Sequence, residues 1–166
     1  MSRLVARRYF LLALAAFGLV GYELLPRDDR RISSLLEDLC AKLNQTRDPA
    51  TLAELQAALR ASLLPEVVIQ GPELGSDLTG PDAVEERARE LLTVAPLSFS
   101  LSDVDVRVSG ALARVTANLI VTVRGSGEQQ RELRFTEVRL RQVGAQWRIE
   151  RVNVEPVRPA EPEARP

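Results

Sequence analysis

The chain begins with a long apolar run. Residues 9–22 read YFLLALAAFGLVGY and follow three arginines. A membrane-spanning helix needs roughly 17 to 25 apolar residues. Extending the run to Leu25, with Glu23 counted as a side chain that reaches the interface, gives 17 residues. This pattern predicts an export or anchoring signal within residues 1–26.

Two forms of this signal remain open, beside a less favoured buried core helix. The first is an uncleaved transmembrane anchor through residues 9–25. The second is a cleaved signal peptide, since Ala16-Phe17-Gly18 has the small-x-small pattern that signal peptidases accept. Because a short amino-terminal tail stays inside easily, we expect the chain after about residue 26 to leave the cytoplasm. The expected location is the bacterial inner membrane with the domain on the periplasmic side, or, after cleavage, the periplasm itself.

The next part of the chain has the periodicity of helices. Apolar residues recur at helical spacing through 29–45 and again through 49–65, where Asp48-Pro49 is a helix start signal. Residues 66–70 form a short β-rich run. Gly80-Pro81-Asp82 then predicts the start of a third helix.

After Pro96 the apolar period changes from about four to two, which indicates strands. Glycine turns separate four expected strands, at residues 97–108, 111–124, 131–142 and 147–154. The alternation changes parity at Ser102-Asp103, Thr136-Glu137 and Glu150-Arg151. Each change predicts a β-bulge, and repeated bulges imply a strongly curved sheet.

These elements predict an α+β fold in which three helices pack on a curved antiparallel sheet, preceded by one transmembrane or signal helix. The expected domain organisation is a signal segment at 1–26, a folded domain at 27–155 and a Pro-rich disordered tail at 156–166.

Composition narrows the chemistry. The chain has 22 basic and 23 acidic residues, one cysteine and no histidine. The lack of histidine excludes Ser/His and Cys/His nucleophile pairs and HExxH zinc sites, and one cysteine forbids an internal disulfide. We expect no cofactor and no metal. Without residues 1–26 the chain has 19 basic and 22 acidic residues. Nucleic-acid-binding domains are typically basic, so we expect no nucleic-acid partner.

The last strands carry a family resemblance. Residues 139–149 read RLRQVGAQWRI, and Gly80-Pro81-Asp82-Ala83-Val84 precedes the third helix. With the order of elements, these residues resemble the nuclear transport factor 2-like superfamily, which includes SnoaL-like and ketosteroid isomerase-like proteins, over residues 29–155. The resemblance implies a cone-shaped α+β barrel with a pocket between helices and sheet. It also implies a homodimer or another protein partner through the sheet face, and it fixes no single reaction.

The chain departs from the enzymes of that superfamily. Ketosteroid isomerase-like members use a tyrosine, but Tyr9 and Tyr22 both lie in the export segment. Dehydratase-like members rely on histidine, often near the position of Val152-Asn153 in the closing strand, and this chain has none. The remaining candidates for proton transfer are carboxylates such as Glu137. A carboxylic acid in an apolar pocket can have a raised pKa, which allows it to exchange a proton near neutral pH.

Five residues are candidates for the lining of a ligand pocket: Phe99, Asn118, Phe135, Glu137 and Trp147. Each also has an ordinary structural interpretation, as a core aromatic residue or a solvated strand position. We therefore expect a membrane-tethered or exported binding or assembly module that is not catalytic. The alternative is a SnoaL-like enzyme or carrier for a small apolar ligand that uses a pocket carboxylate such as Glu137.

Overall fold

The computed structural model describes residues 27–46, 48–94, 97–124 and 129–157. The predicted anchor and most of the predicted tail lie outside these residues, so both stay predictions. None of the helices within the described ranges is long and apolar enough to cross a membrane.

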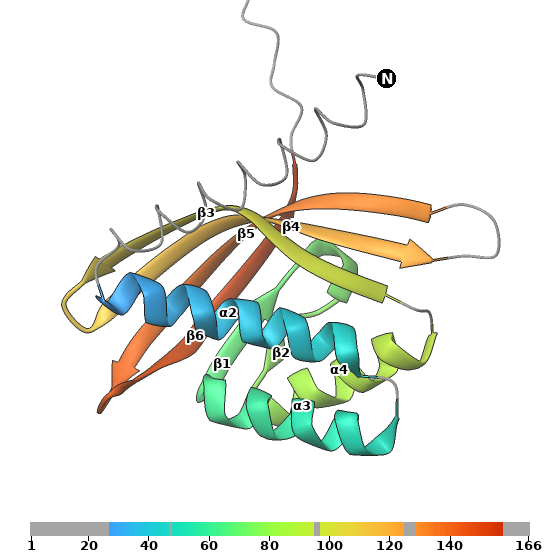
Figure 1. The fold of residues 1–166 in the computed structure, drawn as a ribbon, viewed down its shortest axis with the longest axis horizontal. Coiled ribbons are helices and arrows are strands. Elements are labelled where there is room, and N and C mark those ends of the chain that lie inside the picture. Colours follow the sequence, from blue (N-terminus) through green and yellow to red (C-terminus); the bar gives the residue numbers. More distant parts are fainter. Residues whose placement is uncertain (1–26, 47, 95–96, 125–128, 158–166) are drawn as a thin grey trace, which may run out of the picture.

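Three helices and one 3-10 turn cover the sheet (Figure 1). Their bounds are α2 Arg27–Gln45, α3 Pro49–Ser62, η1 Pro72–Leu74 and α4 Pro81–Val94. Helix α3 begins with a capping box, in which Asp48 Oδ1 accepts a hydrogen bond from the Thr51 backbone N at 2.9 Å and Thr51 Oγ1 accepts one from the Asp48 N at 3.1 Å. The three predicted helices are confirmed.

Six strands form one sheet in the order β2-β1-β6-β5-β4-β3. Their bounds are β1 Leu63–Gln70, β2 Leu78–Thr79, β3 Leu97–Ser109, β4 Leu112–Arg124, β5 Gln129–Val143 and β6 Gln146–Pro156. Strands β3 to β6 pair antiparallel, as predicted. The sheet is mixed rather than antiparallel throughout, because β1 runs parallel to β6.

The boundary between α3 and β1 differs from the prediction. The apolar period suggested a helix up to Pro65, but α3 ends at Ser62 and β1 begins at Leu63. The residue before a proline is biased toward extended backbone, which favours a strand at Leu64. Leu63 and Leu64 are buried by their place in the sheet.

Two of the three predicted bulges are present. The β3–β4 register shifts between Ser102 and Asp105, where Asp103 takes a positive φ of 52°, and the β5–β6 register shifts where Glu150 has no opposite residue. The predicted bulge at Thr136-Glu137 is wrong, because the β4–β5 pairing is continuous there. The apparent change of parity arises because Leu133 and Phe135 are apolar residues on the exposed face.

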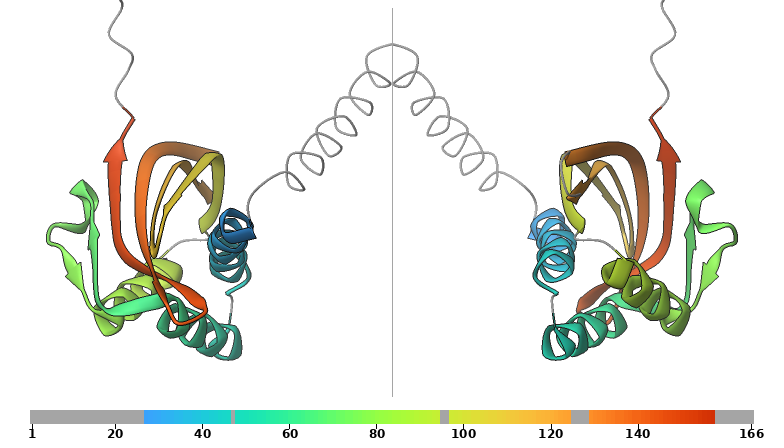
Figure 2. Two further views of the ribbon diagram at one scale, coloured as in Figure 1. Left: turned by 90° about the vertical axis from the view of Figure 1, so that its left-hand side faces the viewer. Right: turned by 90° about the vertical axis from the view of Figure 1, so that its right-hand side faces the viewer.

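The curved sheet surrounds a core that the helices complete, and Figure 2 shows the sheet bending over α2, α3 and α4. Helix α2 packs along β3, and α3 contacts α2, α4, β1 and β6. We call the sheet face toward the helices the inner face and the opposite face the outer face. The inner face of β4 and β5 carries Ala113, Val115, Val138 and Leu140, all of them buried in the hydrophobic core.

Candidate functional site

A cavity of about 300 Å³ lies between the helices and the inner face of the sheet. Helices α2, α3 and α4, the segment from β1 to β2, and the inner sides of β3, β4 and β6 all contribute to it. Its lining consists of Leu39, Cys40, Leu43, Leu59, Leu63, Ile69, Leu74, Leu78, Val84, Arg87, Ala88, Phe99, Leu119, Ile149 and Val152. The volume is at the lower end of the range for small-molecule sites.

The lining is almost entirely aliphatic. Arg87, Cys40 and the aromatic Phe99 are the exceptions, and no Asp, Glu or Tyr is among the lining residues that the structure describes. General acid–base catalysis needs a group that can donate or accept a proton near the reacting atom. The described wall of the cavity offers apolar contact and no carboxylate.

Cys40 lies on the face of α2 that borders the cavity. Burial raises the pKa of its thiol, and the nearby charge of Glu37 raises the pKa further. The thiolate is the nucleophilic form of cysteine. Cys40 therefore contributes a neutral, weakly polar surface at neutral pH rather than a reactive group.

Arg87 lies on α4, one turn beyond Val84. Its Nη1 donates to Glu90 Oε2 at 3.0 Å, and its Nε is buried without a hydrogen-bond partner among the described residues. An unpaired buried donor costs free energy unless something accepts its proton. Because this Nε is itself buried, it adds almost no polar surface to the cavity.

Beside the cavity, one side chain hydrogen-bonds to the backbone of the edge strand β3. The Asn44 amide at the end of α2 donates from Nδ2 to the Phe99 carbonyl at 2.7 Å, and its Oδ1 accepts from the Phe99 N at 2.6 Å. This amide takes the place of a neighbouring strand for one residue of the edge strand β3. It holds Phe99 beside the cavity.

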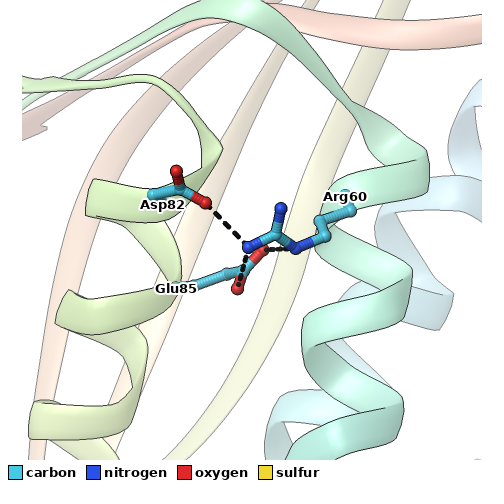
Figure 3. A network of polar contacts seen from close by, with 3 residues as sticks. All are labelled: Arg60, Asp82 and Glu85. Carbon is cyan, nitrogen blue, oxygen red and sulfur yellow. Dashed lines mark hydrogen bonds and ion pairs between the residues drawn. The ribbon is translucent and has the colours of Figure 1, made fainter.

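Helices α3 and α4 are joined beside the cavity by an ion-pair network (Figure 3). Arg60 Nη2 donates to Asp82 Oδ1 at 2.7 Å and to Glu85 Oε2 at 3.0 Å, while Nε lies 2.7 Å from Glu85 Oε1 outside hydrogen-bond geometry. The hydrogen bonds that Arg60 donates to Glu85 and, second, to Asp82 raise the pKa of the arginine. Because Glu85 is buried, this network positions the α4 residues that line the cavity, including Val84 and Arg87.

The structure separates the five predicted pocket residues. Phe99 lines the cavity. Asn118, Phe135 and Glu137 have the parity of the outer face, opposite the helices. Asn118 Nδ2 donates to Asp103 Oδ2 at 2.8 Å, so it supports the bulge of β3.

Glu137 and Trp147 also have structural partners. Glu137 Oε1 accepts from Arg139 Nε at 3.0 Å and lies 3.7 Å from Arg114 Nε. Trp147 is buried outside the apolar cavity, and its Nε1 donates to Asp28 Oδ1 at 3.4 Å in the first turn of α2. Both arrangements match the structural interpretation of these residues.

The sequence interpretation missed several lining residues. Leu74 and Leu78 fall between the short β-rich run and the third helix, where no element was predicted, and the pairing of β2 with β1 brings them to the cavity. Arg87 was detectable in principle, because it lies three residues after the apolar Val84 on the expected helix face. Within the described ranges no group of three His, Cys, Asp or Glu side chains could hold a metal ion.

Solved structures share this fold. A protein of unknown function from Mycobacterium tuberculosis matches with a TM-score of 0.68 at 18% identity, over 80% of this chain and 78% of its own. A candidate dehydratase of the nuclear transport factor 2-like family from Streptomyces avermitilis matches with a TM-score of 0.65 at 18% identity, over 80% and 98%. At such identities the likeness shows the fold alone.

A third structure, a nuclear transport factor 2-like protein with a cystatin-like fold from Novosphingobium aromaticivorans, matches with a TM-score of 0.61 at 16% identity, over 86% of each chain. No curated protein matches the chain. The model of the SnoaL-like domain matches residues 36–153, from the middle of α2 into the later part of β6. The chain therefore belongs to the SnoaL-like domain family, within the superfamily that the last strands and the third helix had indicated.

Proposed function

We propose that the chain is a tethered or exported binding module whose cavity holds a small apolar molecule without acting on it chemically. The observation that carries this proposal is the cavity itself, about 300 Å³ in volume and lined by aliphatic side chains and Phe99. Burial of apolar ligand surface is favourable by about 25 cal/mol per Å². A ligand of this class would gain most of its affinity from shape and burial.

The proposed ligand is apolar over its whole surface. Arg87 is the one cation among the described lining residues, but its Nε is buried and so out of reach of a molecule in the cavity. The proposed class is thus a compact apolar molecule.

The chemistry of the described wall supports the proposal that the module is not catalytic. The carboxylate that the enzyme alternative needs, Glu137, has outer-face parity and lies between two arginines. The named acid of that alternative therefore does not reach the cavity.

Binding can be tested on the segment 27–157, which contains the sheet, the three described helices and their core. The probe is a naphthalene-based fluorophore that brightens in apolar surroundings. We expect saturable binding to the parent segment and at least about tenfold weaker binding to Ala88→Phe, because the added ring fills part of the cavity. The matched control is Ala57→Phe on the exposed side of α3, which should bind like the parent.

Two outcomes would overturn the binding proposal. One is a parent segment that does not bind the probe, and the other is equal binding by Ala88→Phe and the parent. Conversion of a bound molecule by the parent segment, lost in Ala88→Phe, would overturn the claim that the module is not catalytic.

The tether is proposed from the apolar run of residues 9–25. The domain would lie on the periplasmic side of a bacterial inner membrane or, after cleavage, free in the periplasm. Reporters that work only inside or only outside the cytoplasm, fused after Cys40, test this topology. Activity of the inside reporter alone would refute it, and carbonate extraction of membranes separates an anchor from a cleaved signal.

A further inference from the structure

One end of the domain combines exposed apolar tips with an excess of arginine. The β3–β4 and β5–β6 turns lie at this end beside the first turn of α2, on the left in Figure 1. The Gln142 N donates to the Ala111 carbonyl at 2.8 Å and so joins the two turns. The bond from Trp147 to Asp28 joins the second hairpin to α2. We call this region, residues 27–33, 60–66, 105–114 and 137–151, the hairpin end.

The tips of the hairpin end expose apolar side chains to solvent. Leu112 is 54% exposed, Val143 45% and Val108 36%. They flank two tight turns, Gly110-Ala111 and Gly144-Ala145, in which the first residue has a positive φ. Ordinary turn tips are polar, and nothing in a ligand cavity on the inner face requires apolar residues here.

Charge is divided unevenly between the hairpin end and the rest of the domain. The hairpin end holds ten arginines and six acidic residues, a net charge of +4, and one of these arginines, Arg60, is paired with Asp82 and Glu85 outside the hairpin end. The other residues between 27 and 157 hold seven basic and fourteen acidic residues, a net charge of −7. A negatively charged surface would attract the hairpin end and repel the opposite end.

The amino-terminal chain leaves the domain at the same end. Five residue steps separate Tyr22, at the end of the uninterrupted apolar run, from Arg27, the first residue of α2. An extended chain covers at most about 18 Å in that length. If residues 9–25 cross a membrane, the first turn of α2 cannot lie further than this from the hydrocarbon layer.

We infer that the hairpin end is a membrane-contact surface that docks on a bilayer containing anionic phospholipid, with Leu112 and Val143 inserted among the headgroups and the arginines facing the phosphates. Basic residues around apolar side chains are the pattern of interfacial membrane binding. This inference rests on the tether in the proposed function, and it adds the orientation of the domain. The rest of the domain, which is acidic, then faces away from the membrane.

The test uses the full chain in lipid nanodiscs that carry brominated lipid, which quenches nearby tryptophan. Leu112→Trp places a reporter at the hairpin end. Leu133→Trp is the matched control, because Leu133 is 43% exposed on the outer face of β5. It lies ten residues, or roughly 33 Å of strand, from the tip residue Val143. The signal of buried Trp147 is subtracted with the parent chain, and equal thermal unfolding shows that both variants fold.

In discs with about one third anionic lipid we expect the Leu112→Trp signal to lose roughly half its intensity to bromine. Leu133→Trp should lose no more than the parent. The quenching should weaken in purely zwitterionic discs and at about 0.5 M salt, where surface charge is screened.

The outcomes separate this inference from the tether. A parent chain that does not co-elute with discs overturns the tether and the membrane-contact surface with it. A chain that co-elutes without quenching of Leu112→Trp, or with equal quenching of Leu133→Trp, overturns the contact surface alone. Equal quenching in anionic and zwitterionic discs overturns the role of the arginines.

Discussion

The inner and outer faces of the sheet are made by alternating residues of the same strands, yet they differ in chemistry. On β4 and β5 the inner positions Val115, Val138 and Leu140 are buried and aliphatic. The neighbouring outer positions carry Arg114, Glu137 and Arg139 as an ion-pair cluster. The difference teaches that in this stretch of β4 and β5 the ionisable groups lie on the face opposite the cavity, whereas Glu132 and Arg134, further along β5, have inner-face parity and pair with each other.

The largest test of this contrast compares two leucines of β5. Leu140 is fully buried on the inner face, whereas Leu133 is 43% exposed on the outer face. We expect Leu140→Ala to lower the free energy of unfolding by about 2 to 5 kcal/mol, because it leaves a cavity in the core. Leu133→Ala should change it by less than about 0.5 kcal/mol. Urea denaturation of the 27–157 segment measures the free energy of unfolding of both variants. Similar losses in the two variants would contradict the distinction between a buried inner face and an exposed outer face.

A second test concerns the edge where the two faces meet. Asn44→Ala removes both hydrogen bonds to the Phe99 backbone and leaves a part-buried N–H and C=O without these partners. We expect a loss of about 1 to 3 kcal/mol in the free energy of unfolding, together with faster amide exchange at Phe99.

Asn153→Ala is the control for that edge, since the Asn153 amide donates to the exposed Glu155 side chain. It should cost less than about 0.5 kcal/mol. Equal effects of the two variants would show that Asn44 does not act as a substitute strand.

The sequence predicted the three helices, the four long strands and two of the bulges, because the spacing of apolar residues along the chain shows which residues share a face. It misread Leu133 and Phe135, since an apolar residue on a solvated face looks like a change of parity. The parallel pairing of β1 with β6 depends on contacts between residues far apart in the sequence, which period does not record.

For the site, alternation along a strand shows which residues share a face but not which face borders the cavity. Phe99 lies on the cavity side, whereas Asn118, Phe135 and Glu137 lie on the opposite face. The residues that make most of the cavity were visible as apolar positions of helices, such as Leu39 and Leu59. Whether such residues meet or leave a void depends on how side chains pack in three dimensions. An empty volume therefore could not be read from the order of residues.

A smaller effect is expected at the outer ion-pair cluster. Glu137→Gln removes the charge between Arg114 and Arg139, and partly exposed ion pairs contribute little. We expect a change of at most about 1 kcal/mol in the free energy of unfolding and no change in the affinity for the apolar fluorophore. Ala88→Phe, which does narrow the cavity, is the comparison in the same binding titration. Weaker binding by Glu137→Gln would show that this carboxylate contributes to ligand binding, and the distinction between the two faces would then fail.

The smallest effect belongs to Cys40, the titratable thiol of the inner face. Burial raises the pKa of its thiol in the folded state, so the unfolded chain gives up this proton at lower pH, near 8.5. Below that value the thiol is protonated in both states and adds no pH dependence. As pH rises above it and approaches the folded pKa, the free energy of unfolding should fall. Urea midpoints between about pH 7 and 10 should therefore decline more in the parent segment than in Cys40→Ser, and a bound apolar ligand should slow alkylation of the thiol. If the urea midpoints of the parent and of Cys40→Ser change with pH in the same way, this side of the cavity is as exposed to water as the outer face.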